Sequence, residues 1–136
     1  DSIVVVHDGV RPFVTTGMIQ DCLSGLKDVD GCIAAVPVND TLKTVDPKAR
    51  ITGTIDRAAA WLAQTPQAFR CDTLLKAHQA AIAHGWQVTD DAALLERLGR
   101  TVRVIPGSSL NIKITTPDDL LLAAAIIDLE PDSQAV

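Results

Sequence analysis

The sequence begins with a stretch that indicates the class of fold, Ile3-Val4-Val5-Val6-His7-Asp8-Gly9-Val10-Arg11-Pro12. Its four β-branched or apolar residues, 3–6, show no alternation with polar residues, which is typical of a short strand covered on both faces. Polar side chains follow at once in His7, Asp8 and Arg11. We therefore expect a buried strand whose carboxyl end carries the first candidate functional residues.

A helix and a second strand are expected next. Apolar residues recur at helical spacing from Thr16 to about Lys27, and the hydroxyl of Thr16 is suited to cap that helix. Residues 32–38 form another apolar run with the length of a buried strand. Strand, helix and strand in this order predict a β-α-β unit with a right-handed crossover.

The later half continues the alternation of strands and helices. It predicts a short strand over residues 61–64, a helix over 71–83, a helix opened by Thr89 as cap and ended by Gly99, and a strand over 102–105. The segment Thr116-Pro117-Asp118-Asp119 is typical of a helix start, with a cap, a proline in the first turn and acidic residues at the positive end of the dipole, and it opens an apolar helix over 120–129. The last helix is apolar enough to lie against a sheet, and residues 130–136 read as a frayed tail. Such alternation predicts an open α/β sheet, which binds ligands at the carboxyl ends of its strands.

Residues 41–45 and 51–55 differ from the other strands because apolar and polar residues alternate in them. With Pro47 between them, the two runs predict a hairpin. A two-stranded hairpin with so few apolar residues does not form a core of its own. We therefore expect it to project as an arm and to pack on another body, for which a partner subunit is the natural candidate.

Composition excludes several classes of function. A chain of 136 residues is sized for a single domain. A net charge of −5, the absence of tyrosine and the lack of any Lys/Arg block argue against a nucleic-acid surface. No apolar run approaches the roughly 20 residues that span a bilayer, and the first residues lack the features of a signal peptide. Three cysteines without a C-x-x-C pair favour a reducing compartment, a cytosol or a plastid-like one, and we expect the cytoplasm.

Asp8 and Arg11 are the first candidates for chemistry, because they follow the first strand where an open sheet places its site. A carboxylate there can accept hydroxyl hydrogens or coordinate Mg²⁺, and the guanidinium can bind an anion. The alternative is structural: Asp8 caps the turn and Arg11 pairs with it. Position alone does not separate the two interpretations.

Lys113, Arg57 and Thr65 are the next candidates. Lys113 lies among apolar residues just ahead of a predicted helix start, a place that attracts phosphate. Arg57 ends the second strand of the arm, although an exposed arginine is more often a solvated surface charge. The hydroxyl of Thr65 could bind a phosphate oxygen or satisfy a local turn. The glycines form neither a G-x-G-x-x-G motif nor a P-loop, and the histidines do not form a metal set.

Six segments, taken in order, resemble the 2-C-methyl-D-erythritol 4-phosphate cytidylyltransferase family. They are residues 6–13, 35–43, 54–57, 61–69, 89–92 and 111–120. The resemblance implies a Rossmann-like nucleotidyltransferase open sheet and a homodimer in which the arm, residues 39–60, reaches the partner's site. It also implies transfer of a cytidylyl group from CTP to methylerythritol phosphate, with Mg²⁺ and without a protein nucleophile.

The resemblance implies a role for each matched polar residue. Asp8, Arg57 and Lys113 would be the catalytic residues, and Arg11, Thr41 and Thr65 would bind substrate. In more detail it places Asp8 near the ribose, the acceptor hydroxyls and Mg²⁺; Arg11 and Thr65 near the acceptor; Thr41 and Arg57 near the acceptor phosphate; and Lys113 near both reacting phosphates.

The sequence departs from the family pattern at its start. Family members begin with a Gly-rich loop bearing Arg and Lys that binds the triphosphate of CTP, and residues 1–136 contain no such loop. We therefore expect this chain to be the C-terminal part of a single cytidylyltransferase domain and to be a poor enzyme alone. Two alternatives stay open: a ribitol 5-phosphate cytidylyltransferase, and a noncatalytic remnant that only dimerises or binds ligand.

Overall fold

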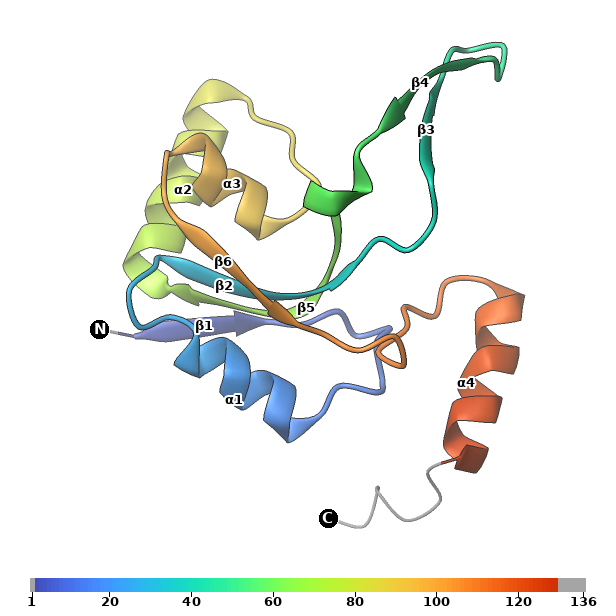
Figure 1. Ribbon diagram of the computed structural model, residues 1–136. Coiled ribbons are helices and arrows are strands. Elements are labelled where there is room, and N and C mark those ends of the chain that lie inside the picture. The colour runs from blue at the N-terminus through green and yellow to red at the C-terminus, as the bar shows by residue number, and fades with distance from the viewer. Residues whose placement is uncertain (1, 130–136) are drawn as a thin grey trace.

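Four strands form the central sheet, in the order β1-β5-β2-β6. A computed structural model describes residues 2–129 of the chain (Figure 1). The strands are β1 (Ile3–Val6), β2 (Gly31–Pro37), β5 (Trp61–Arg70) and β6 (Val102–Pro106). β5 is antiparallel to both β1 and β2, whereas β2 and β6 are parallel. The predicted open α/β sheet is therefore confirmed, and β5 separates the two strands of the predicted β-α-β unit.

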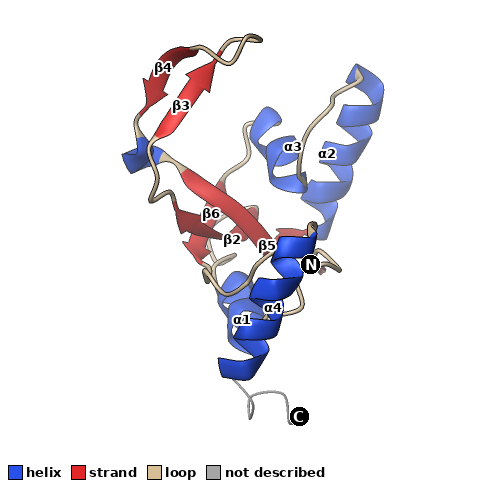
Figure 2. Cartoon of the chain, turned by 90° about the vertical axis from the view of Figure 1, so that its right-hand side faces the viewer, coloured by secondary structure: helices blue, strands red, loops and turns tan. Residues whose placement is uncertain are grey.

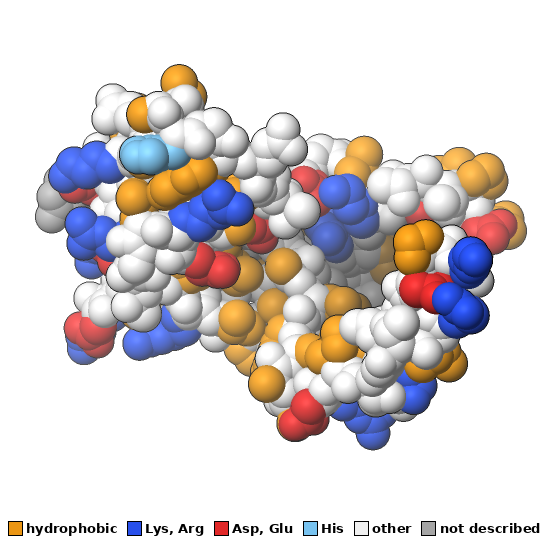
Figure 3. Space-filling model, turned by 90° about the horizontal axis from the view of Figure 1, so that it is seen from above, with side chains coloured by type: hydrophobic (Ala, Val, Ile, Leu, Met, Phe, Trp, Pro, Cys, Tyr) orange, Lys and Arg blue, Asp and Glu red, His pale blue; other side chains and the backbone are white. Residues whose placement is uncertain are grey.

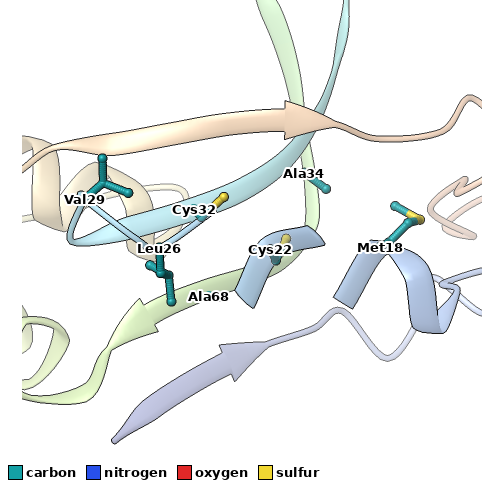
Figure 4. Close-up of a cluster of buried hydrophobic side chains, with 7 residues drawn as sticks. All are labelled: Met18, Cys22, Leu26, Val29, Cys32, Ala34 and Ala68. Carbon is teal, nitrogen blue, oxygen red and sulfur yellow. The ribbon is translucent and has the colours of Figure 1, made fainter. Parts of the chain in front are cut away.

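Helices cover the sheet on both faces. α1 (Thr16–Ser24) lies on one face, and α2 (Cys71–His84) and α3 (Asp91–Arg97) lie on the other (Figure 1). Because successive side chains of a strand point to opposite faces, β2 contributes Cys32 to one core and Ile33 to the other. Figure 4 shows the cluster on the α1 side, which consists of Met18, Cys22, Leu26, Val29, Cys32, Ala34 and Ala68.

β1 is less buried than the sequence predicts. Val4 and Val6 pack against the cluster beneath α2 and α3, but Ile3 and Val5 on the other face are 46% and 38% exposed. α1 packs mainly on β5 and β2. Within residues 2–129, the expectation of a strand covered on both faces is therefore wrong.

Both predicted helix caps are displaced by one residue. The hydroxyl of Thr15, not Thr16, accepts from the backbone N–H of Met18 at 3.2 Å. Likewise Asp90, not Thr89, caps α3 by accepting from the N–H of Ala93 at 3.0 Å. Adjacent polar residues have similar capping propensity, so the approach of the preceding loop decides between them. α1 also ends earlier than predicted, at Ser24 rather than near Lys27.

β5 is longer than the predicted strand over residues 61–64. It continues through a cis Thr65–Pro66 peptide to Arg70. A proline has no N–H to donate to a ladder, so the sequence suggested an end there. The strand continues because Gln67 to Arg70 pair with β1, while the register with β2 shifts between Ile33 and Ala35.

The predicted arm is confirmed as a hairpin. β3 (Leu42–Val45) and β4 (Ile51–Ile55) pair only with each other, as a separate two-stranded sheet. The hairpin stands away from the central sheet (Figure 2). Val45 and Ile51 are 58% and 66% exposed, so these apolar side chains are not covered by the described part of this chain.

α4 (Pro117–Leu129) starts as predicted but does not lie on the sheet. The carboxylate of Asp119 accepts from the N–H of Thr116 at 2.8 Å, and backbone N–H groups, Thr115 foremost, lower the pKa of Asp119. Leu121 and Leu129 are 72% and 78% exposed.

The predicted tail, 130–136, lies outside the described residues. No helix in residues 2–129 has the length and apolar content to cross a membrane.

Gly31 offers a direct test of the packing between β2 and β5. A Cβ added there would lie 2.8 Å from Cδ1 of Phe69 and 3.3 Å from Cδ2 of Leu95, and both of those side chains are fully buried. Overpacking of a filled core typically costs about 1–3 kcal/mol. We expect Gly31→Ala to lower the free energy of unfolding by that amount in urea titrations.

Gly17→Ala is the matched control, because a Cβ at Gly17 meets only the Thr15 hydroxyl, at 3.7 Å. It should leave stability unchanged or raise it, since alanine favours a helix over glycine. Equal stability of the Gly31→Ala and Gly17→Ala variants would contradict the described packing.

Candidate active site

A cleft of about 380 Å³ opens where β1 ends, beside the middle of β5. Its polar lining comes from four regions of the chain: the loop after β1, the strand β5, the N-terminal end of α3 with the residues just before it, and the loop between β6 and α4. The polar residues are Asp8, Arg11, Gln64, Thr65, Gln67, Thr89, Asp90, Asp91 and Lys113. Figure 3 shows the molecule from above, where the surface is hollowed between the α2 side and the arm side and carries both acidic and basic side chains.

Asp8 is the electrostatic centre of this cleft. Its Oδ2 atom lies 3.3 Å from Nε of Arg11 and 3.3 Å from Nζ of Lys113. Burial acts to raise the pKa of Asp8, but the hydrogen bonds and positive charges of Lys113 and Arg11 outweigh it and hold the pKa below its ordinary value. The carboxylate is therefore ionised at neutral pH, with two cations beside it.

Asn111 holds the loop that carries Lys113. It is fully buried, and its Nδ2 donates to the backbone oxygen of Thr65 at 2.8 Å. Its own backbone oxygen accepts from Nη1 of Arg11 at 2.7 Å. The N–H of Ile114 bonds the backbone oxygen of Val10 at 2.9 Å. Through these contacts the loop before α4 is tied to the loop after β1, and Lys113 reaches Asp8 across about a hundred residues of sequence.

Thr65 is tied to the same loop by its side chain. Its Oγ1 accepts from the backbone N–H of Asp8 at 3.0 Å and lies 2.8 Å from Nδ1 of His7. The other ring nitrogen of His7, Nε2, lies 2.9 Å from the backbone oxygen of Arg11. The partners of Thr65 are thus distant in sequence, so its hydroxyl does not merely satisfy a local turn.

Two lining residues were missed in the sequence. Gln64 is 7% exposed and bonds the backbone oxygen of Ser108 at 2.8 Å, and Gln67 is 4% exposed and lies 3.4 Å from the carboxylate of Asp90. Polar residues inside an otherwise apolar strand are the signal that could have found them. It was obscured because the strand was expected to end at Gln64.

Thr41 and Arg57 do not line the cleft. Thr41 lies just before β3 and Arg57 just after β4, and both are exposed at the base of the arm. Nη1 of Arg57 donates to the backbone oxygen of Asn39. The structure therefore brings together four of the six candidate residues, Asp8, Arg11, Thr65 and Lys113, and leaves the two arm residues apart from them.

The chemistry of the cleft suits a ligand that is both anionic and rich in hydroxyls. Lys113 and Arg11 can neutralise a phosphate, while Asp8 and Thr65 can receive hydroxyl hydrogens. Within residues 2–129 no cluster of three His, Cys, Asp or Glu side chains is placed to hold a metal ion. A metal bound in this cleft would therefore depend on one or two of the lining carboxylates, Asp8, Asp90 and Asp91, and on ligand oxygens.

Comparison with known proteins gives a consistent result. The sequence profile of the 2-C-methyl-D-erythritol 4-phosphate cytidylyltransferase family matches residues 1–129. The enzyme of that name from Geotalea uraniireducens is 50% identical over 127 residues, covering 93% of this chain and 54% of that protein. The one from Bacillus licheniformis is 48% identical over 136 residues, covering 100% of this chain and 58% of that protein. The chain spans about half the length of the curated relatives it matches.

Solved structures agree with the sequence comparison. The crystal structure of 2-C-methyl-D-erythritol 4-phosphate cytidylyltransferase from Thermus thermophilus is 36% identical and has a TM-score of 0.84, covering 93% of this chain and 62% of that one. The Francisella tularensis enzyme is 38% identical with a TM-score of 0.84, covering 91% and 58%. The residues that form the cleft lie within the matched region, and the chain belongs to the 2-C-methyl-D-erythritol 4-phosphate cytidylyltransferase family.

Proposed function

We propose that the protein containing this chain transfers a cytidylyl group from CTP to 2-C-methyl-D-erythritol 4-phosphate. The observation that carries the proposal is the Asp8 carboxylate held between Lys113 and Arg11 in a cleft of a chain that the family profile covers almost completely. The products are 4-diphosphocytidyl-2-C-methyl-D-erythritol and pyrophosphate, which places the protein in non-mevalonate isoprenoid precursor synthesis.

The reaction requires two anions to meet in line. A phosphate oxygen of the acceptor forms a bond to the α-phosphorus of CTP, and the bond from that phosphorus to the bridging oxygen of pyrophosphate breaks. No protein nucleophile is needed, so the protein acts by positioning and by neutralising charge. Lys113 suits this role because its side chain is 49% exposed at the cleft, and its ammonium is therefore accessible to an incoming phosphate.

Mg²⁺ is the proposed cofactor, and the donor set fits it. Mg²⁺ is commonly bound by one or two carboxylates together with substrate phosphates and water, rather than by a cage of protein ligands. Both contacts to the Asp8 carboxylate from residues 2–129 use Oδ2, which leaves Oδ1 for a ligand. When bound there, the ion would neutralise phosphate charge; Asp8 would hold it, and Lys113 and Arg11 would keep Asp8 ionised.

The acceptor is proposed to be methylerythritol phosphate rather than ribitol phosphate. The curated relatives at 48–50% identity carry the methylerythritol phosphate name, and so do the solved structures with TM-scores of 0.84. The cleft itself offers hydroxyl acceptors and cations, which any sugar-alcohol phosphate would use. Turnover of the two acceptors, measured side by side, distinguishes them.

We also propose a homodimer in which the arm of one protomer completes the site of the other. Thr41 and Arg57 are exposed and lie outside the cleft of their own chain, and the arm carries uncovered apolar side chains at Val45 and Ile51. In a dimer, Arg57 would supply a cation for the acceptor phosphate.

The three free cysteines, Cys22, Cys32 and Cys71, support a cytoplasmic location.

Replacement of Lys113 tests the proposed activity. In the native polypeptide that contains residues 1–136, Lys113→Ala should reduce kcat by about a hundredfold, since loss of one group that stabilises transition-state charge typically costs about 3 kcal/mol. Pyrophosphate release with CTP, Mg²⁺ and methylerythritol phosphate is the measurement.

Lys76→Ala is the matched control, because Lys76 is exposed on α2 and only 4.0 Å from Asp72. It should keep full activity. A native polypeptide that folds but releases no pyrophosphate would favour the noncatalytic alternative, and full activity of Lys113→Ala would remove Lys113 from the mechanism.

Mixed dimers test whether the arm serves the partner's site. Lys113→Ala and Arg57→Ala chains can be co-expressed. In a mixed dimer, the site formed by the cleft of the Arg57→Ala chain and the arm of the Lys113→Ala chain has both side chains. With random pairing, half of the dimers are mixed and one of their two sites is intact, so about a quarter of wild-type activity should return. An arm that serves its own cleft would give no recovery above that of the separate variants.

A further inference from the structure

His7 lies outside the cleft but contacts one of its walls. His7 is an exposed residue that does not line the cleft, whereas Thr65 is 8% exposed and does line it. Nδ1 of His7 is 2.8 Å from the hydroxyl of Thr65, and Nε2 is 2.9 Å from the backbone oxygen of Arg11. Any ligand that contacts Thr65 therefore binds a hydroxyl group that is also hydrogen-bonded to His7.

These contacts determine which ring nitrogen carries the proton. The backbone oxygen of Arg11 can only accept, so Nε2 must donate to it through an N–H. A neutral imidazole has one N–H, which leaves Nδ1 with a lone pair directed at Thr65. The tautomer is thus assigned from the hydrogen-bond partners of the ring.

The same reasoning determines the proton of Thr65. A hydroxyl has one hydrogen to donate and two lone pairs that accept. The hydrogen is donated to Nδ1 of His7, and one lone pair accepts the backbone N–H of Asp8 at 3.0 Å. Only the second lone pair is left for the cleft. In this state Thr65 accepts a hydrogen from a ligand hydroxyl and has none to give to a phosphate oxygen.

We propose that His7 is a positioning residue that, through Thr65, makes this wall of the cleft a receptor for a hydroxyl group of the acceptor. The inference rests on the proposed function and deepens it. The sugar-alcohol end of the acceptor binds Thr65, and its phosphate is directed to the cations at Lys113 and Arg11. Of the two alternatives that the sequence left open for the Thr65 hydroxyl, a phosphate oxygen and a local turn, it replaces both with a hydroxyl of the acceptor.

The tautomer can be observed directly and independently of turnover. In long-range ¹H–¹⁵N spectra of ¹⁵N-histidine protein at about pH 8, where an ordinary imidazole is neutral, His7 should carry its N–H at Nε2. His7→Phe identifies the signal among the three histidines of the chain. Thr65→Val should shift the Nδ1 resonance because it removes that nitrogen's hydrogen-bond donor. An N–H at Nδ1 would overturn the inference.

Kinetics test whether His7 acts through Thr65. His7→Phe should raise KM for methylerythritol phosphate by about tenfold, the size expected for one misdirected hydrogen bond, with a smaller change in kcat and none in KM for CTP. Thr65→Val should do the same, and the double variant should be no worse than Thr65→Val alone. Additive effects, or an unchanged KM in His7→Phe, would overturn the inference.

Two further variants separate positioning from folding. His7→Asn keeps an acceptor near the place of Nδ1 and should recover part of the lost affinity for the acceptor. His84→Phe removes a histidine on α2, away from the cleft, and should change neither KM. If the wild-type protein does not turn over methylerythritol phosphate, the proposed function fails, and the assignment of Thr65 to the polyol fails with it. If the wild-type protein is active and His7→Phe has no effect, only the inference about His7 is rejected.

Discussion

The insertion of β5 between β1 and β2 is the constraint on which the rest of the structure depends. Because β5 is antiparallel to both strands, its middle passes the carboxyl end of β1, and Thr65 meets the backbone of Asp8 there. The same strand places Phe69 and Ala68 in the two opposite cores. The register of β5 therefore determines both the packing of the sheet and the assembly of the cleft, since a shift in that register would move Thr65 away from the loop after β1.

The side chain of Asn111 is a second structural link, and it brings the charged side chains of the cleft together. Asn111 is fully buried and joins the Lys113 loop to Thr65, so Lys113 and Arg11 both arrive at one carboxylate. The lining of the cleft is mixed in charge, because Lys113 and Arg11 share it with the carboxylates of Asp8, Asp90 and Asp91, in a chain whose net charge is −5. The two cations can pair with a phosphate there although the net charge of the protein is negative. Placement of charges, more than composition, supports the proposed chemistry.

The sequence predicts the elements of the fold better than their contacts. Apolar periodicity and turn residues were sufficient for the sheet, the arm and the start of α4 at Thr116. They failed where tertiary pairing decides: β5 continues past Pro66 because β1 pairs with it, and Asp90 caps α3 in place of Thr89. Gln64 and Asn111 were missed as site residues for the same reason, since their partners are more than forty residues away in sequence. Asp8 and Lys113 were predictable as candidates, but not as partners.

The most direct test of the central claim is a crystal structure of the native polypeptide with methylerythritol phosphate bound. We expect the ligand in the cleft beside Asp8, with a hydroxyl within hydrogen-bond distance of the Thr65 hydroxyl and the phosphate facing the Lys113 ammonium. A ligand bound elsewhere, for example in the surface groove beside Trp86 between α2 and α3, would contradict it. So would the reversed orientation, with the phosphate on Thr65 and the polyol on Lys113.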